Sequence, residues 1–369
     1  MNEIIELFSN LHLTQSWLLV AIIVLALGFD YINGFHDAAN SIATIVTTRV
    51  LTPFQAVFWA AVFNFAAYFI SLYVIGEFKI GNTIAKSIDV QFITLEVILA
   101  GLVAAILWNL ATWKLGIPSS SSHTLIGGFI GAALAFAGGF TGDDGTSVIV
   151  YEKVVPIFLF IFGAPFLGLI LAYFITVAIL WICRKVNPHK AEQWFKRLQL
   201  VSSALFSLGH GGNDAQKVMG IIGAAVIYYH INVVPDPEYF KPGVNTFKVF
   251  VSHWSWVPLA SFLFIGLGTM SGGWKIVKTM GSKITKVTPL EGVAAETAGA
   301  FSLYVTEHLG VPVSTTHTIT GAIIGVGVTK RISAVRWGVT ISLLWAWILT
   351  IPVSALVAVL VYYAIKMFI

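Results

Sequence analysis

Two copies of one polar motif stand inside strongly apolar sequence, and their residue types could bind an anion. Residues 115–127 read LGIPSSSSHTLIG, and residues 309–321 read LGVPVSTTHTITG, 194 positions further on. Proline disfavours helix in the residue before it, and the Ser and Thr residues that follow can cap a returning helix. The N-terminus of such a helix offers free N–H groups and about half a positive charge. Each motif therefore predicts a helix tip suited to an oxyanion, although ordinary capping and interhelical packing would explain one copy alone.

A second repeated motif carries acidic and amide side chains. Residues 34–40 read GFHDAAN and residues 211–217 read GGNDAQK, so Asp37 and Asp214 are equivalent at an offset of 177. A carboxylate at membrane depth is costly unless it is paired or bound to a cation. Asp, Asn and Thr side chains and freed backbone carbonyls are the oxygen ligands that hard cations prefer. We expect the glycines of each motif to break the helix and free those carbonyls; the alternative is a buried hydrogen-bonded network.

Other polar residues in apolar segments leave two interpretations open. Lys217 could pair with the aspartate three residues before it on a helix, or face a bound anion. His123 and His317 could relay protons, although a hydrogen bond to a loop carbonyl is the commoner role. Glu296 could bind a cation or be protonated in place. Asp30 is expected to be an interfacial or solvated acid.

The composition indicates a polytopic membrane protein. The chain has 369 residues, of which 57% are hydrophobic and 10% are charged, whereas soluble domains carry about 25% charged residues. Several apolar runs are long enough to cross roughly 30 Å of hydrocarbon. The net charge of +4 then reflects basic cytoplasmic loops rather than binding to nucleic acid. The single cysteine excludes an intrachain disulfide, no Cys/His spacing suits zinc, and we expect no bound cofactor.

The repeated motifs divide the chain into two halves. We expect a first repeat at 1–182 with a hairpin at 91–137, a basic cytoplasmic linker at 183–198, and a second repeat at 199–369 with a hairpin at 290–329. Lys and Arg residues in the linker, and at 275–286 and 330–336, place these segments in the cytoplasm. This holds only if the hairpins are re-entrant and enter from opposite sides. The predicted fold class is therefore an all-α polytopic membrane protein of two inverted-topology repeats, each with a re-entrant helical hairpin and a broken helix.

Together the motifs resemble those of the inorganic phosphate transporter (PiT) family. Its repeated G-x-(N/H)-D-x-x-(N/K) and P-x-S-(S/T)-(S/T)-H-T elements appear here as GFHDAAN, GGNDAQK, PSSSSHT and PVSTTHT, spread over nearly the whole chain. The GFHD and NDAQK forms resemble the bacterial branch. The resemblance implies a phosphate symporter of the cell inner membrane, with both hairpin tips at the site, and a homodimer. It also implies sodium or protons as coupling ion and, for some bacterial members, a neutral metal–phosphate complex as cargo.

On this basis the sequence predicts import of inorganic phosphate driven by a sodium gradient. The expected phosphate ligands are Ser120, Ser121, Ser122, Ser314, Thr315, Thr316 and Gln216, and the expected sodium ligands are Asp37, Asn40, Asn213 and Asp214. Sodium is favoured because the clusters are rich in oxygen, and proton coupling is the alternative. Sulfate, which is also tetrahedral, would accept the same donors. An intramembrane hydrolase is disfavoured, because the adjacent Ser122 and His123 would not face each other on a helix.

Overall fold

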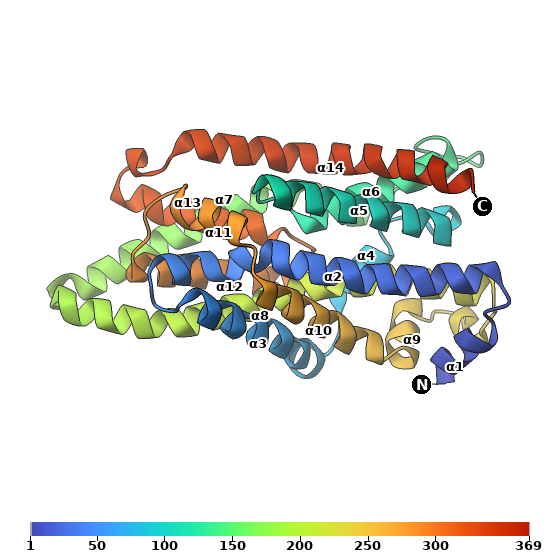
Figure 1. Ribbon diagram of the computed structural model, residues 1–369, viewed down its shortest axis with the longest axis horizontal. Coiled ribbons are helices and arrows are strands. Elements are labelled where there is room, and N and C mark those ends of the chain that lie inside the picture. Colours follow the sequence, from blue (N-terminus) through green and yellow to red (C-terminus); the bar gives the residue numbers. More distant parts are fainter. Residues whose placement is uncertain (1, 369) are drawn as a thin grey trace.

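Long helices lie side by side along one axis of the molecule (Figure 1). The computed structural model describes residues 2–368, and helices dominate them. The first half contains α1 (Asn2–Ser9), α2 (Thr14–Thr47), α3 (Pro53–Ile70), η1 (Ser71–Ile75), α4 (Lys79–Ala85), η2 (Val90–Phe92), α5 (Leu95–Leu115), α6 (Ser121–Ala137) and α7 (Tyr151–Ile182). The second half contains η3 (Cys183–Lys185), α8 (Pro188–Asn232), η4 (Pro237–Phe240), α9 (Thr246–His253), α10 (Trp256–Ser271), α11 (Trp274–Ser282), α12 (Pro289–Leu309), α13 (Thr315–Lys330), η5 (Ile332–Ala334) and α14 (Trp337–Lys366).

Several helices are long and apolar enough to cross a membrane. Among the described residues, α2, α3 with η1, α5, α7 and α14 qualify by length and composition. The pair α9 and α10 qualifies together and is bent by 78° between its two parts. The predicted polytopic, all-α class is therefore confirmed.

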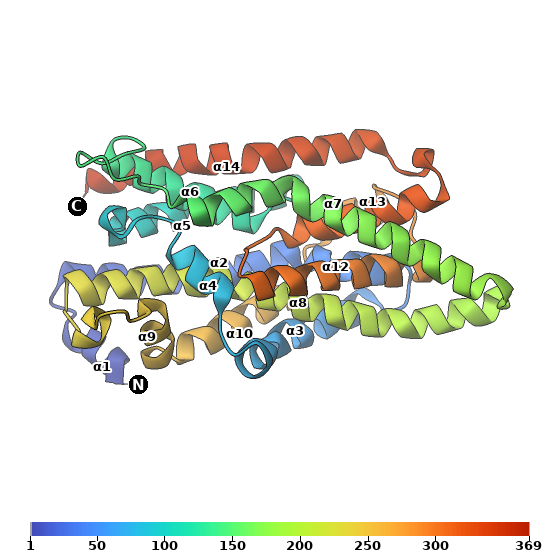
Figure 2. The ribbon, with the colours of Figure 1, turned by 180° about the vertical axis from the view of Figure 1, so that it is seen from behind.

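The order of elements recurs, and the second copy is inverted. In each half a long helix with the acidic motif (α2, α8) is followed by a short helix (α4, α11), a helical hairpin (α5–α6, α12–α13) and a last long helix (α7, α14). Figures 1 and 2 show α2 and α8 running in opposite directions, as do α7 and α14. The halves also interlock, because α6 packs on α14 and α13 packs on α7.

In each hairpin, the turn between the two arms consists of a glycine and a short segment that contains proline. Gly116 and Gly310 end the first arms with φ values of 69° and 70°, a left-handed conformation that favours glycine. The returning arms begin at Ser121 and Thr315. The arms α5–α6 and α12–α13 begin and end within a few residues of the expected ranges 91–137 and 290–329.

The expected break in the helices of the acidic motifs is wrong. Both α2 and α8 are continuous across these motifs, so their backbone carbonyls stay within the helices. The glycines instead allow close approach of neighbouring helices. A Cβ at Gly34 would lie 2.3 Å from the carbonyl oxygen of Ile265, and one at Gly211 would lie 2.3 Å from that of Asn64. Residues 188–198, expected as part of the linker, are the first turns of α8.

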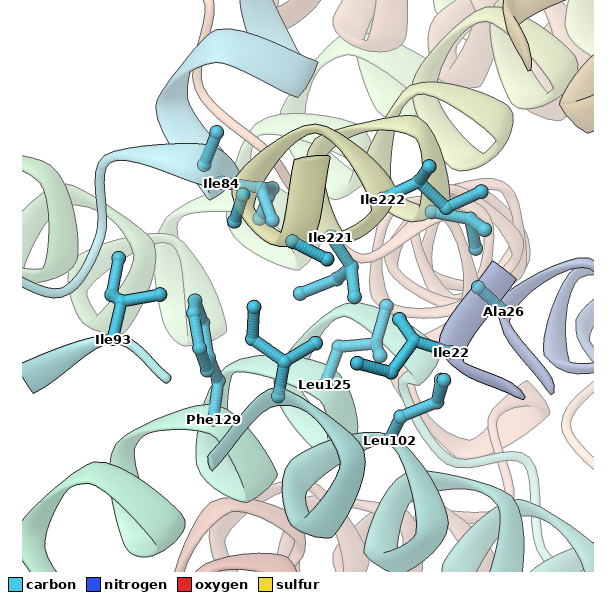
Figure 3. Packing of buried hydrophobic residues seen from close by; sticks show 14 of the residues in the cluster. Ile22, Ala26, Ile84, Ile93, Leu102, Leu125, Phe129, Ile221 and Ile222 are labelled. Carbon is cyan, nitrogen blue, oxygen red and sulfur yellow. The ribbon is translucent and has the colours of Figure 1, made fainter. Parts of the chain in front are cut away.

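Apolar packing fixes the first hairpin against the two long helices. Figure 3 shows Ile22 of α2, Leu125 and Phe129 of α6, and Ile221 of α8 converging in one buried cluster. Leu125 lies one turn beyond the start of α6, so burying it also holds the tip of the hairpin in place.

The close contact between α13 and α7 gives a stability prediction. A Cβ at Gly321 would lie 2.0 Å from the carbonyl oxygen of Pro165, whereas nothing lies within 4 Å of a Cβ at Gly338. Gly321→Ala should therefore push the helices apart and lower the stability by about 1–3 kcal/mol, as overpacking does. Thermal unfolding in detergent should show a lower melting temperature for this variant and an unchanged one for the control Gly338→Ala. Equal melting temperatures would contradict the tight α7–α13 contact.

Candidate functional site

The two hairpin tips meet and are joined by a reciprocal pair of hydrogen bonds. Ser122 Oγ donates to the carbonyl oxygen of Val313 at 2.9 Å, and Thr316 Oγ1 donates to that of Ser119 at 3.2 Å. Ser122 and Thr316 are equivalent at the offset of 194, as are Ser119 and Val313. The predicted meeting of the tips is therefore confirmed, and an approximate two-fold relation runs between them.

Ser120 and Ser314 cap the returning arms. Their hydroxyl oxygens accept hydrogen bonds from the backbone N–H groups of His123 and His317, both at 3.2 Å. The predicted capping is confirmed. The other N–H groups of each first turn have no partner within the helix, which suits an anion.

The acid of the first half is bound to its own tip. Asp37 Oδ2 accepts from Ser121 Oγ at 3.3 Å, and Asp37 Oδ1 lies 2.5 Å from His36 Nδ1. The other ring nitrogen of His36 lies 3.2 Å from Thr112 Oγ1 on α5. Asp37 is 2% exposed, so this network holds a carboxylate away from solvent.

The acid of the second half has more partners. Asp214 Oδ1 accepts from Lys217 Nζ at 2.5 Å, so the ion pair is present; contact of this lysine with a bound anion stays open. Asp214 Oδ2 lies 3.3 Å from His210 Nε2 and 3.5 Å from both Asn33 Nδ2 and Thr315 Oγ1. Lys217 Nζ also donates to the carbonyl oxygen of Val313 at 3.0 Å, so it contacts the second tip as well.

The two acids come together in one buried cluster beside the tips. Ligand atoms of Asp37, His210 and Asp214 all lie within 4.8 Å of one another. Asn40 donates to Thr315 Oγ1 and Thr316 Oγ1, both at 3.0 Å. His210 was not among the residues predicted from the sequence, although its place one turn before Asp214 was a usable signal. Carboxylate, imidazole and amide groups here can hold a cation directly beside an anion on the tips.

Two of the expected ligands lie apart from these contacts. Gln216 donates to Glu307 Oε1 at 2.8 Å and accepts from the backbone N–H of Ile80 at 3.1 Å. The side-chain amide of Asn213 is buried and makes no hydrogen bond to the described residues. Glu307, which was not predicted from the sequence, also accepts from Ser71 Oγ at 2.8 Å.

Glu296 forms a separate buried polar centre between α2, α8 and α12. Its carboxylate accepts from Thr44 Oγ1 at 2.6 Å, from Gln199 Nε2 at 2.9 Å and from Ser202 Oγ at 2.5 Å. All three donors are neutral, so the carboxylate is solvated by the protein without a counter-charge. The alternatives of a bound cation or a bound proton both stay open for this residue.

Two expectations about individual residues are wrong. Asp30 is fully buried on α2 rather than interfacial, because α2 extends well beyond the apolar run that ends near it. His123 makes no ring hydrogen bond to the part of the chain that the structure describes. Instead it packs against His317 with ring centroids 4.9 Å apart, and His317 stacks on Trp347 at 4.0 Å. The rings of the two histidines therefore pack against each other, and a role in relaying protons stays open.

Comparisons with known proteins agree with this arrangement. Residues 33–358 match the model of the phosphate transporter family. A probable low-affinity inorganic phosphate transporter of Rhizobium meliloti is 48% identical over 348 residues, which cover 94% of this chain and 96% of that protein. One of Bacillus subtilis with the same description is 40% identical over 354 residues, which cover 95% of this chain and 98% of that protein.

A solved structure supports the fold. It is described as "The sodium-dependent phosphate transporter" and matches with a TM-score of 0.77 at 24% identity, over 95% of this chain and 100% of that one. The family and these relatives are transporters, which excludes the hydrolase alternative. The chain therefore belongs to the phosphate transporter family and is a multi-pass protein of the bacterial plasma membrane.

Proposed function

We propose that the chain imports inorganic phosphate by symport with sodium, through alternating access to a site between the two hairpin tips. The observation that carries this proposal is the meeting of two capped helix N-termini directly beside a buried pair of aspartates. The relatives described as inorganic phosphate transporters support phosphate as cargo. The sodium dependence named for the structural neighbour supports sodium as coupling ion.

Phosphate would bind to the hydroxyl and N–H groups of the tips. The proposed ligands are Ser120, Ser121, Ser122, Ser314, Thr315 and Thr316. Gln216 would have to leave Glu307 to join them. All six tip residues are buried, so the tips must separate to admit an anion from either side of the membrane.

Sodium would bind to oxygen atoms of Asp37, Asn40, Asn213 and Asp214. Its positive charge would offset the burial of the two carboxylates and of phosphate in a medium of low dielectric constant. Each ion would then raise the affinity for the other by the same factor, which is the thermodynamic requirement for coupling.

A shared hydroxyl provides the physical link between the two ions. Ser121 donates to Asp37, and the equivalent Thr315 donates to Asp214. A hydroxyl has one proton to donate and two lone pairs. When sodium neutralises the carboxylate, the hydroxyl oxygen can turn a lone pair to the metal and its proton to phosphate. Phosphate thus gains a donor only after the cation has arrived.

A metal–phosphate complex is the second candidate cargo. Asp37, His210 and Asp214 lie close enough to hold one ion, and an imidazole with two carboxylates suits a divalent metal. Uptake of phosphate that needs added magnesium or manganese, and that stops with a chelator, would favour this alternative. The homodimer implied by the resemblance stays a prediction.

Loss of one carboxylate should stop driven uptake. Asp37→Asn keeps the shape but removes the charge that attracts the cation; losing one partner of a buried charge pair costs roughly 2–5 kcal/mol. We expect the initial rate of labelled phosphate uptake into proteoliposomes with an inward sodium gradient to fall at least about 30-fold, since each 1.4 kcal/mol is about tenfold. Asp143→Asn, in an exposed loop, is the matched control and should transport normally. Uptake at the wild-type rate by Asp37→Asn would overturn the proposed site.

Separate gradients test the coupling ion. We expect phosphate to accumulate in proteoliposomes under an inward sodium gradient at uniform pH, and not under a pH gradient without sodium. Accumulation driven by the pH gradient alone would assign coupling to protons. Excess sulfate should leave labelled phosphate uptake unchanged, because a carboxylate acceptor beside the tips favours an anion that can donate a proton. Strong competition by sulfate would contradict selectivity for phosphate.

A further inference from the structure

The two acidic motifs differ at one equivalent position, and the difference changes the charge of the site. At the offset of 177, Asp37 matches Asp214, whereas Asn40 matches Lys217. The first half therefore has a neutral amide where the second has a lysine. Lys217 is 1% exposed and lies in the middle of α8, so its charge is directed into the protein.

We propose that the Lys217 ammonium is a built-in cation that takes the place of a second sodium ion, so that the site binds a single sodium on the side of Asp37. This inference rests on the proposed sodium–phosphate symport and deepens it. It concerns the number of sodium ions bound and transported with each phosphate.

The contacts of the ammonium are those that a metal cation would make. Lys217 Nζ lies 2.5 Å from Asp214 Oδ1 and 3.0 Å from the carbonyl oxygen of Val313. Val313 precedes the first residue of α13, so its carbonyl is not part of that helix. A carboxylate together with a tip carbonyl is an all-oxygen setting suited to a hard cation. A lysine held there is permanently present and needs no ion from solution.

The carboxylates of the two halves differ in how many donors they already have. Asp214 accepts from Lys217, Asn33 and Thr315, and His210 Nε2 lies 3.3 Å from it. An ionised carboxylate has about four acceptor positions. Asp37 has contacts with His36 and Ser121. The acceptor capacity left for a sodium ion is therefore greater at Asp37 than at Asp214.

Unpaired amide oxygens lie on both long helices, two of them on α2 and that of Asn213 on α8. Asn33 Oδ1 and Asn40 Oδ1 are buried and have no hydrogen-bond donor among residues 2–368. Asn40 already donates its amide protons to Thr315 and Thr316, which fixes its oxygen on the opposite side of the amide group. Unpaired buried acceptors are costly, and a bound cation would satisfy them.

Replacing Lys217 by the residue of the first half tests the proposal. Lys217→Asn should open a second cation position with the same residue types as the first. We expect the dependence of phosphate uptake on sodium concentration to steepen from a Hill coefficient of about 1 in the wild type toward about 2. The ratio of labelled sodium to labelled phosphate entering proteoliposomes should rise in the same proportion.

Matched variants separate the charge from other effects. Lys217→Arg keeps a cation at the position and should keep the sodium dependence of the wild type. Lys190→Asn removes an exposed lysine from the same helix and should leave uptake unchanged. A Lys217→Asn variant with weaker apparent affinity for phosphate but an unchanged sodium slope would identify Lys217 as an anion ligand and overturn the proposal.

Binding to the purified wild type provides a test that does not depend on any variant. Equilibrium binding of labelled sodium is measured at saturating phosphate for the wild type and for Asp37→Asn. The wild type should bind one more sodium ion per chain than the variant, and this difference counts the ions held in the cluster. Loss of two sodium ions in Asp37→Asn would mean that the wild-type cluster binds two of them. That result would overturn the proposed role of Lys217 and leave the proposed sodium coupling intact. Wild-type uptake without any need for sodium would contradict the proposed coupling, and with it this inference, before any variant is compared.

Discussion

The cost of burying Asp37 and Asp214 within the membrane domain is the constraint on which the rest of the structure depends. Both carboxylates are at most 2% exposed and lie on long helices that pass through the centre of the protein. A buried charge persists only if donors or counter-charges surround it. The hairpin tips, two histidines and Lys217 supply these groups. The same need is the physical reason for the proposed cation site beside Asp37.

The inverted repeat brings two ends of helices to one point. The arms of each hairpin cross only part of the protein, and each returning arm starts at its tip with N–H groups that lack a partner within the helix. Ser122 and Thr316 tie the tips to each other, while Ser121 and Thr315 tie them to the acids. An anion and a cation at this point would therefore share the same side chains, which makes their binding interdependent.

Duplication did not preserve full symmetry at the site. At the offset of 177, Asn33 corresponds to His210 and Asn40 to Lys217, so the second half is richer in basic side chains. Glu296 and Glu307 likewise lie only on α12 of the second half, where residues of α8 solvate both. The proposed single sodium site follows from this asymmetry, because Lys217 already pairs with the acid of the second half.

The sequence by itself determined the membrane class, the recurrence of the polar motifs and the capping of the returning arms, because hydropathy, proline and capping residues act locally. Only the tertiary structure decided why the acidic motifs contain glycine. Gly34 and Gly211 leave room for backbone atoms of α10 and α3, and they do not break their own helices. The tertiary structure also decided that Asp30 is buried, that Gln216 donates a hydrogen bond to Glu307, and that His210 lies beside the two aspartates. These outcomes depend on which helices become neighbours, and spacing along one chain does not specify the partners that lie across an interface.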